Sequence, residues 1–252
     1  MTKTVAIANR KGGVGKTATA HALGAGLLQR GYKVLFVDLD SQCNLTDALG
    51  VDVKEVEASS LDVLEGSSTA SEAILQTEGG DLLPATPDLA KADKLIEGVG
   101  SEYKLRDALQ PLSRRYDYII IDTPPALGVL TINALTASNK VIIPAQADLY
   151  SLQGIEQLYG TIGAVQHFTN KKLKTDGILI TRYAGRSIIS KDMRGNLEEV
   201  ARIIDSKVYK TPIRECIAVR EAQATHTDIF SYSRKSNASK DYEAFIDEFL
   251  GG

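Results

Sequence analysis

A glycine-rich segment near the start of the chain has the residue types that bind phosphate. It comprises, in order, Lys11, Gly12, Gly13, Val14, Gly15, Lys16 and Thr17. Glycines let backbone N–H groups turn toward phosphate oxygens, and a following helix adds the partial positive charge of its N-terminus. In such a loop Lys16 would contact the β- and γ-phosphates, and the Thr17 hydroxyl would help to bind Mg²⁺. The segment therefore predicts a site for a nucleoside triphosphate.

The segment departs from the usual phosphate-loop pattern, G-x-x-x-x-G-K-[ST], at two places. Arg10 stands at the position of the first glycine, and a second lysine, Lys11, lies inside the loop. This extra cation narrows the class of nucleotide-binding protein more than the glycines do.

Two apolar runs end in carboxylates that suit magnesium and water chemistry. The first leads into Asp38 and Asp40, which the two-residue period of a strand directs to one face. Beside a phosphate loop, one carboxylate could orient or activate the attacking water and the other could support the Mg²⁺ shell. Such a pair could also merely cap the next helix. The second run leads into Asp122, as in a Walker B strand, whose aspartate holds Mg²⁺, usually through water.

A parallel sheet would bring these segments together, because ligands of such sheets bind at the carboxyl ends of the strands. Apolar runs without alternation predict strands that are covered on both faces. The strongest lie at Thr4–Ala8, Val34–Asp38, Tyr118–Ile121, Val141–Pro144 and Gly177–Thr181, with weaker ones at Asp81–Pro84 and Lys207–Tyr209. Helical patterns occur at Thr17–Gln29, Leu89–Glu97, Glu102–Gln110, Val129–Ala137, Leu152–Phe168, Asp192–Ile204 and Lys240–Phe249.

Strands that alternate with helices predict an α/β fold with a doubly wound, mostly parallel sheet and helices on both faces. The irregular segment Val51–Gly80 is expected to form an excursion of short helices. We expect residues 1–252 to form a single domain.

The composition is that of an ordinary globular chain, with 43% hydrophobic and 24% charged residues. A strand begins within four residues of Met1, so we expect no signal peptide. No apolar stretch approaches the roughly 20 residues of a membrane-spanning helix. Cys43 and Cys216 form no CxxC pair, and the three histidines are scattered. This pattern favours a reduced, cytoplasmic compartment and disfavours a disulfide framework or a Cys/His metal cluster.

Charge is unevenly distributed along the chain. The net charge is −3, yet Lys171–Arg220 contains 12 Lys/Arg and 6 Asp/Glu, a local charge of +6. This region is either a solvated charged face or a contact surface for a polyanion.

The three motifs together resemble the deviant Walker A ATPases of the ParA/MinD superfamily. The resemblance rests on the Lys11–Thr17 loop, on Asp38 and Asp40, and on the Ile-Ile-Asp122-Thr-Pro-Pro segment. After the strand at Val141–Pro144, the segment Leu149–Gly154 is similar to ParA and Soj proteins in particular. The resemblance implies a P-loop NTPase fold of the deviant Walker A type and a ParA/Soj-type partition ATPase that uses ATP and Mg²⁺.

The family assigns roles to matching positions in this chain. Lys11 matches the signature lysine, which reaches the partner's phosphates across an ATP-bound homodimer, as an arginine finger does. Asp40 matches the carboxylate associated with the attacking water, so the implied catalytic residues are Lys11, Lys16 and Asp40. The implied Mg²⁺ residues are Thr17, Asp38 and Asp122. Besides the loop, the implied nucleotide contacts are Ala18, Thr181, Arg182, Pro212 and Arg214.

Two positions differ from the common family pattern. Ala18 replaces a frequent second threonine, which removes a hydroxyl but not the Mg²⁺ ligand. Cys43 stands where a glycine is common. A redox role for this thiol would need a lowered pKa, so a small packing residue is the favoured interpretation.

The C-terminal segment distinguishes between branches of the superfamily. MinD-type proteins end in a basic amphipathic helix that binds anionic lipid, whereas Lys240–Gly252 carries four carboxylates and one lysine. Tyr242, Phe245, Ile246 and Phe249 have a helical spacing that is typical of core packing. We therefore expect no membrane partner.

Small partition ATPases, as the resemblance implies, bind DNA without sequence preference and respond to a ParB-like adaptor protein. Contacts to the DNA backbone need only clustered cations. The candidate DNA contacts are Arg186, Lys191, Arg194, Arg214, Arg220, Arg234 and Lys235. The alternative is a ParA-like positioning or regulatory ATPase that acts on a protein scaffold instead of DNA. Either protein would be cytoplasmic, and the first would be associated with the nucleoid.

Overall fold

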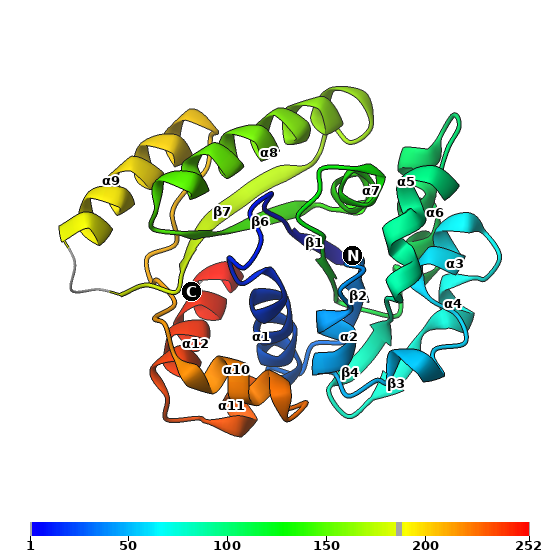
Figure 1. Cartoon of the computed structure of the whole chain (residues 1–252), viewed down its shortest axis with the longest axis horizontal. Coiled ribbons are helices and arrows are strands. Elements are labelled where there is room, and N and C mark those ends of the chain that lie inside the picture. The colour runs from blue at the N-terminus through cyan, green and yellow to red at the C-terminus, as the bar shows by residue number, and fades with distance from the viewer. Residues whose placement is uncertain (1, 185–187, 252) are drawn as a thin grey trace.

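Seven strands of the described chain form one sheet in the order β3-β4-β2-β5-β1-β6-β7 (Figure 1). The computed structural model describes residues 2–184 and 188–251, without the side chains of residues 149–150 and 188–193. The strands are β1 (Lys3–Ile7), β2 (Val34–Asp38), β3 (Leu75–Thr77), β4 (Gly80–Leu83), β5 (Tyr118–Asp122), β6 (Lys140–Gln146) and β7 (Lys174–Thr181). Neighbouring strands are parallel, except for the antiparallel hairpin of β3 and β4 at one edge.

Helices cover both faces of the sheet, because successive strand residues point to opposite sides. On β1, Val5 and Ile7 join a core cluster with one set of helices, and Ala6 joins the cluster on the other face. The first set contains α1 (Lys16–Gln29), α2 (Asn44–Ala48), α10 (Ile217–Ala224), α11 (Ile229–Tyr232) and α12 (Asn237–Leu250).

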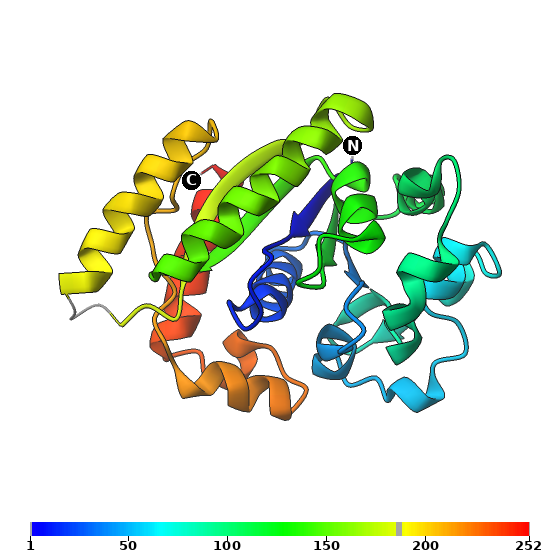
Figure 2. The ribbon, with the colours of Figure 1, turned by 45° about the horizontal axis from the view of Figure 1, so that its top comes forward.

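The second set lies on the opposite face, and Figure 2 shows α8 and α9 across the sheet from α10 and α11. This set contains α3 (Ser60–Glu65), α4 (Ala70–Ala73), α5 (Ala92–Leu95), α6 (Lys104–Leu109), α7 (Val129–Ala137), α8 (Leu149–Phe168) and α9 (Ile188–Ile203). Short 3₁₀ helices lie at η1 (Val53–Glu55), η2 (Pro87–Lys91), η3 (Ser101–Tyr103) and η4 (Gln110–Leu112).

The register of the three central strands positions the expected site. Ile7 at the end of β1 pairs with Asp122 at the end of β5, and Asp38 at the end of β2 pairs with the same Asp122. The glycine-rich loop that follows β1 therefore leaves the sheet next to the Asp122 end of β5, and the Asp38 end of β2 lies one strand farther away.

The predicted α/β class and mostly parallel sheet are confirmed, and all five strong strand predictions correspond to observed strands. Lys207–Tyr209 is not a strand and makes only an isolated bridge between Val208 and Ile178. The edge strand β3 and the helices α10 and α11 were not predicted, because three- to eight-residue elements give too little periodicity. Leu89–Glu97, predicted as one helix, is divided between η2 and α5.

The C-terminal helix α12 belongs to the core, as its spacing predicts. Tyr242, Phe245, Ile246 and Phe249 are all at most 7% exposed and pack in the cluster that contains α1. Within the described residues, none of the helices combines the length and apolar character needed to cross a bilayer.

We predict that Gly24→Ala destabilises the protein, because α1 packs closely on β2 at this glycine. A Cβ atom on Gly24 would lie 2.1 Å from a ring carbon of Phe36, which is fully buried. We expect a loss of about 1–3 kcal/mol in the free energy of unfolding, as for other overpacked cores. Urea denaturation measures it.

Gly160→Ala in α8 is the matched control, since a Cβ atom there meets nothing within 4 Å. Its free energy of unfolding should rise by about 0.5–1 kcal/mol, the usual gain from replacing a helical glycine. Equal unfolding midpoints for the two variants would contradict the close packing of α1 on Phe36.

Candidate nucleotide-binding site

The glycine-rich loop has a backbone shape that only glycine adopts easily. Gly13 and Gly15 have φ angles of +71° and +85°, in the left-handed region. Gly15 is the N-cap of α1, and no side chain caps the helix there. The first N–H groups of α1 therefore remain available to an anion at the helix N-terminus.

Hydrogen bonds with β6 and β7 hold this loop in place. The Asn9 amide donates to the carbonyl oxygen of Pro144 at 2.7 Å and accepts from the backbone N–H of Lys11 at 3.0 Å. The Thr181 hydroxyl donates to the carbonyl oxygen of Val14 at 2.7 Å. Thr181, predicted to contact the base, thus lines the pocket while it also supports the loop.

Lys11 is held within its own chain. Its ammonium pairs with the carboxylate of Asp148 and donates to the side-chain oxygen of Gln146 at 3.1 Å. Partial burial alone would raise the pKa of Asp148, but hydrogen bonds from Lys11 and the Ser151 backbone lower it below its usual range. The cross-dimer role of Lys11 stays a prediction, and that role would require the lysine to leave Asp148.

Lys16 is a nearly buried cation between the loop and the aspartates. Its side chain is 7% exposed, and its ammonium lies 3.4 Å from the carbonyl oxygen of Lys11. Burial lowers its pKa, while the negative charges of Asp122 and Asp40 oppose this shift. The ammonium is therefore poorly compensated, and a phosphate would supply the missing negative charge.

Asp122 is a fully buried carboxylate whose oxygens lack hydrogen-bond partners among the described residues. Burial and the neighbouring Asp38 raise its pKa well above the usual range, although the Thr17 hydroxyl and Lys16 lie close enough to counteract part of the shift. A buried, unsatisfied carboxylate is unfavourable unless a cation or donor completes it. A hydrated Mg²⁺ next to Thr17 would do so, and these residues therefore fit the expected ion.

The described residues contain no group of three His, Cys, Asp or Glu side chains arranged as a metal site. Mg²⁺ usually keeps several waters and binds one or two protein oxygens together with substrate phosphates. Thr17 and Asp122 are the protein groups best placed for this purpose.

Asp38 has a different environment from the one the sequence suggests. It is fully buried, and its oxygens accept from the backbone N–H of Asp40 at 3.0 Å and from the N–H and hydroxyl of Thr46 at 2.9 and 2.8 Å. Burial raises its pKa to about 6 despite these bonds. Asp38 thus fixes the start of the Asp40 turn and α2, and its part in the Mg²⁺ shell stays a prediction.

Asp40 faces the pocket, as a carboxylate that acts on water must. It is 8% exposed, lines the cavity and accepts from the backbone N–H of Gln42 at 3.1 Å. Cys43 follows with a left-handed φ of 55° and is 4% exposed. Burial and the charges of Asp38 and Asp40 raise the pKa of this thiol to about 12, so it packs rather than reacts.

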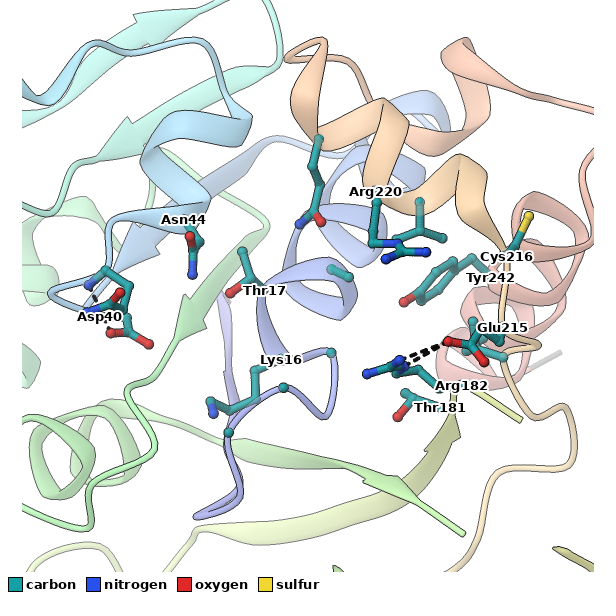
Figure 3. A pocket seen from close by; sticks show the side chains of 18 of the residues that line it. Lys16, Thr17, Asp40, Asn44, Thr181, Arg182, Glu215, Cys216, Arg220 and Tyr242 are labelled. Atoms are coloured by element: carbon teal, nitrogen blue, oxygen red, sulfur yellow. Dashed lines mark hydrogen bonds and ion pairs between the residues drawn. The ribbon is translucent and has the colours of Figure 1, made fainter. Parts of the chain in front are cut away.

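A pocket of about 560 Å³ opens in front of the loop (Figure 3). One side is formed by β7 and the segment before α10. There Arg182, in a left-handed conformation at φ 50°, pairs with Glu215 at 2.8 Å. Arg214 makes a two-pronged contact with Asp241 of α12 at 2.6 and 2.8 Å. Of the expected base-side residues, Thr181, Arg182 and Arg214 line the pocket, whereas Pro212 does not.

The structure adds pocket residues that the sequence did not suggest. Asn44 of α2 and Tyr242 of α12 line the cavity, as does the start of α10 with Cys216, Val219 and Arg220. Arg220 was predicted only as a DNA contact. Because the short helix α10 was not predicted from its sequence, nothing indicated that it faces the loop.

The candidate DNA contacts that the structure describes lie on different parts of the fold. Arg186 lies outside the described residues, and for Lys191 only the backbone, within α9, is described. Arg194 pairs with Glu198 at 3.0 Å. Arg234 and Lys235 are exposed just before α12. Arg214 and Arg220 line the pocket, and the DNA role of all these candidates stays a prediction.

Known proteins are similar to this chain over nearly its full length. The profile of a family described as an AAA domain matches residues 2–175. The sporulation initiation inhibitor protein Soj of Bacillus subtilis is 41% identical over 245 residues, which make up 96% of either chain. The chromosome partitioning protein ParA of Myxococcus xanthus is 37% identical and aligns with 98% of this chain and 88% of its own length.

Solved structures show the same architecture. A Mycobacterium smegmatis protein described as cobyrinic acid a,c-diamide synthase, with a bound ATP analog and magnesium, superposes with a TM-score of 0.86. It is 38% identical in sequence, and the match covers 99% of this chain and 95% of that one. The similarity thus extends beyond the phosphate loop to the whole fold.

We predict that Asp122→Asn stabilises the ligand-free protein and abolishes the effect of Mg²⁺ and nucleotide on its melting temperature. The pKa of Asp122 is raised, so the native state binds more protons than the unfolded state, and stability falls as pH rises above the unfolded pKa of 3.8. The neutral amide removes this penalty. Its melting temperature should exceed that of the unmodified protein at pH 7.5, by ~2–4 °C for each kcal/mol relieved, and by less at pH 4.5.

Calorimetry at the two pH values, with and without Mg²⁺ and nucleotide, measures both effects. Asp117→Asn, at an exposed aspartate outside the pocket, is the control. A lower melting temperature for Asp122→Asn at pH 7.5 would show that the buried carboxylate does not destabilise the free protein.

Proposed function

Because the chain belongs to the ParA/Soj family of partition ATPases, we propose that it hydrolyses ATP with Mg²⁺, dimerises around ATP and binds DNA without sequence preference. In this proposal a ParB-like adaptor stimulates hydrolysis, and the cycle segregates DNA within the cytoplasm, on the nucleoid. The observation that carries the proposal is Asp122, buried and unsatisfied below the loop beside Lys16 and Thr17.

In this proposal, different residues of the pocket have different roles in phosphoryl transfer. The backbone of Gly12–Gly15 and the N-terminus of α1 bind the phosphates, and Lys16 neutralises their charge. Mg²⁺, held by Thr17 and by Asp122 through water, would neutralise charge on the phosphate oxygens. Asp40, fixed by Asp38, orients the attacking water.

Lys11 links hydrolysis to dimer formation in this proposal. Within the single chain its ammonium is paired with Asp148 and is unavailable to a partner. The ATP-bound dimer would offer it a more highly charged partner, the phosphates of the facing subunit. Exchange of one partner for the other would make the dimer the state in which the catalytic set is complete.

The partition role has more support than the alternatives. Soj and ParA, which match this chain over nearly its whole length, carry names that refer to sporulation and chromosome partitioning. The M. smegmatis protein carries the name of a synthase, and the described pocket holds no additional feature that favours such a reaction. A positioning ATPase on a protein scaffold would use the same nucleotide site but would not need DNA.

The dimer part of the proposal predicts different results for two variants. Asp40→Ala should lower kcat at least about 10²-fold and accumulate an ATP-bound dimer, because water is no longer oriented. Adding Lys11→Ala should keep ATP binding but leave the protein monomeric. Size-exclusion chromatography with light scattering, combined with phosphate release, measures both.

Lys54→Ala, at an exposed lysine on η1, is the matched control and should behave as the unmodified protein. Normal turnover by Asp40→Ala would refute the role of Asp40. A dimer formed equally well by the Asp40→Ala/Lys11→Ala protein would refute the cross-dimer role of Lys11.

The DNA part predicts a loss of binding when charge is reversed at Arg234 and Lys235. Both side chains are exposed, and neither forms an ion pair with another described residue. The Arg234→Glu/Lys235→Glu variant should retain ATP binding but bind nonspecific duplex DNA at least about 10-fold more weakly, with a shallower salt dependence. Fluorescence anisotropy with ATP at several salt concentrations measures it.

Lys54→Glu/Lys94→Glu reverses the same charge at two exposed lysines on the opposite side of the sheet and should bind DNA normally. If the unmodified protein shows no ATP-dependent DNA binding at low salt, the scaffold alternative replaces the DNA proposal.

A further inference from the structure

Arg220 is an unpaired arginine on the wall of the nucleotide pocket. It lies on α10 and lines the cavity with Val219 and Gln223. The other two arginines of the pocket are neutralised, Arg182 by Glu215 and Arg214 by Asp241. None of the described residues forms a hydrogen bond or ion pair with Arg220, so its guanidinium is available to a ligand.

The guanidinium points toward the beginning of α1. Figure 3 shows it between Thr17 and Tyr242, on the side of the pocket opposite Lys16. The neighbouring Tyr242 is buried, and burial raises the pKa of its hydroxyl to about 12. A neutral tyrosine does not neutralise the arginine.

The order of groups along a nucleotide identifies what Arg220 meets. Lys16 takes the terminal phosphates, and the base side is expected at Arg182 and Arg214. The α-phosphate must lie between these ends, above the start of α1. That position is bounded by Ala18 on α1 and by Arg220 on α10, both of which line the pocket.

Ala18 contributes no side-chain donor at this place, where the backbone N–H groups of α1 are the other donors. Its methyl group cannot donate a hydrogen bond to the α-phosphate, and it is only half-buried, so it leaves room there. An arginine fork donates two N–H groups to a phosphate and is the side chain that best fits such an oxygen pair.

We propose that Arg220 binds the α-phosphate of the nucleotide and supplies from α10 the donor that Ala18 lacks on α1. The inference rests on the proposed function of the pocket as a nucleotide site. It moves Arg220 from the DNA surface to the nucleotide site. Since ADP and ATP share the α-phosphate, Arg220 stabilises both complexes equally and does not sense the γ-phosphate.

Nucleotide affinities of variants test the assignment. Arg220→Ala should bind Mg-ADP and a slowly hydrolysed Mg-ATP analogue about 10- to 100-fold more weakly, by the same factor for each, as expected for a lost charged hydrogen bond. Uniform weakening raises KM and leaves kcat unchanged. Arg220→Lys should fall in between, because it keeps the charge without the fork. Isothermal titration calorimetry measures the affinities.

A second substitution separates this role from a structural one. Ala18→Thr restores a hydroxyl on α1, so the Ala18→Thr/Arg220→Ala protein should recover part of the ADP affinity. Arg114→Ala, which removes another exposed arginine without a partner among the described residues and outside the pocket, should bind ADP normally.

The outcomes distinguish the inference from the function on which it rests. Unchanged ADP affinity of Arg220→Ala, with loss of DNA binding, would overturn the inference and restore Arg220 as a DNA contact. A selective loss of ATP affinity would overturn it as well, since it would place Arg220 at the γ-phosphate. Failure of the unmodified protein to bind either nucleotide would overturn the proposed function together with the inference.

Discussion

The structure depends on the burial of two carboxylates at adjacent strand ends. Asp38 and Asp122 are paired in the β2–β5 register and fully removed from water, and this burial raises both pKa values, with the charge of Asp38 adding to the shift of Asp122. Asp38 is compensated by Thr46 and the Asp40 backbone, but Asp122 has only the nearby Thr17 and Lys16. The free protein therefore keeps a buried carboxylate that lacks enough compensating positive charge, and a magnesium nucleotide would supply that charge.

This deficit explains why neighbouring parts of the site are built for support. Asn9, bonded to Pro144 of β6, and Thr181 of β7 hold the loop, so that its N–H groups stay in place without a ligand. Preorganised donors lose little entropy when an anion binds. Lys11 is the exception among the groups of the site. Its ion pair with Asp148 keeps it away from the position expected in the dimer, so the free site is incomplete.

Much of the fold followed from local patterns. Strands such as Val34–Asp38 and helices such as Val129–Ala137 were predicted at their observed bounds, because long apolar runs and helical periods are strong signals. Short elements were missed because their signals are weak. The most important of them is α10, because it carries Arg220. The partners of Asp38 and Lys11 were also missed, since Thr46 and Asp148 meet them only through tertiary contacts.

The sequence by itself determined the kind of chemistry: a phosphate loop, its carboxylates and a second lysine, each recognisable from residue type and spacing within a few positions. Only the tertiary structure decided which of these groups are satisfied. Whether a carboxylate is left bare, as Asp122 is, or a cation is paired, as Lys11 is, depends on residues distant in sequence. Desolvation and pairing arise from packing, and local sequence does not encode them.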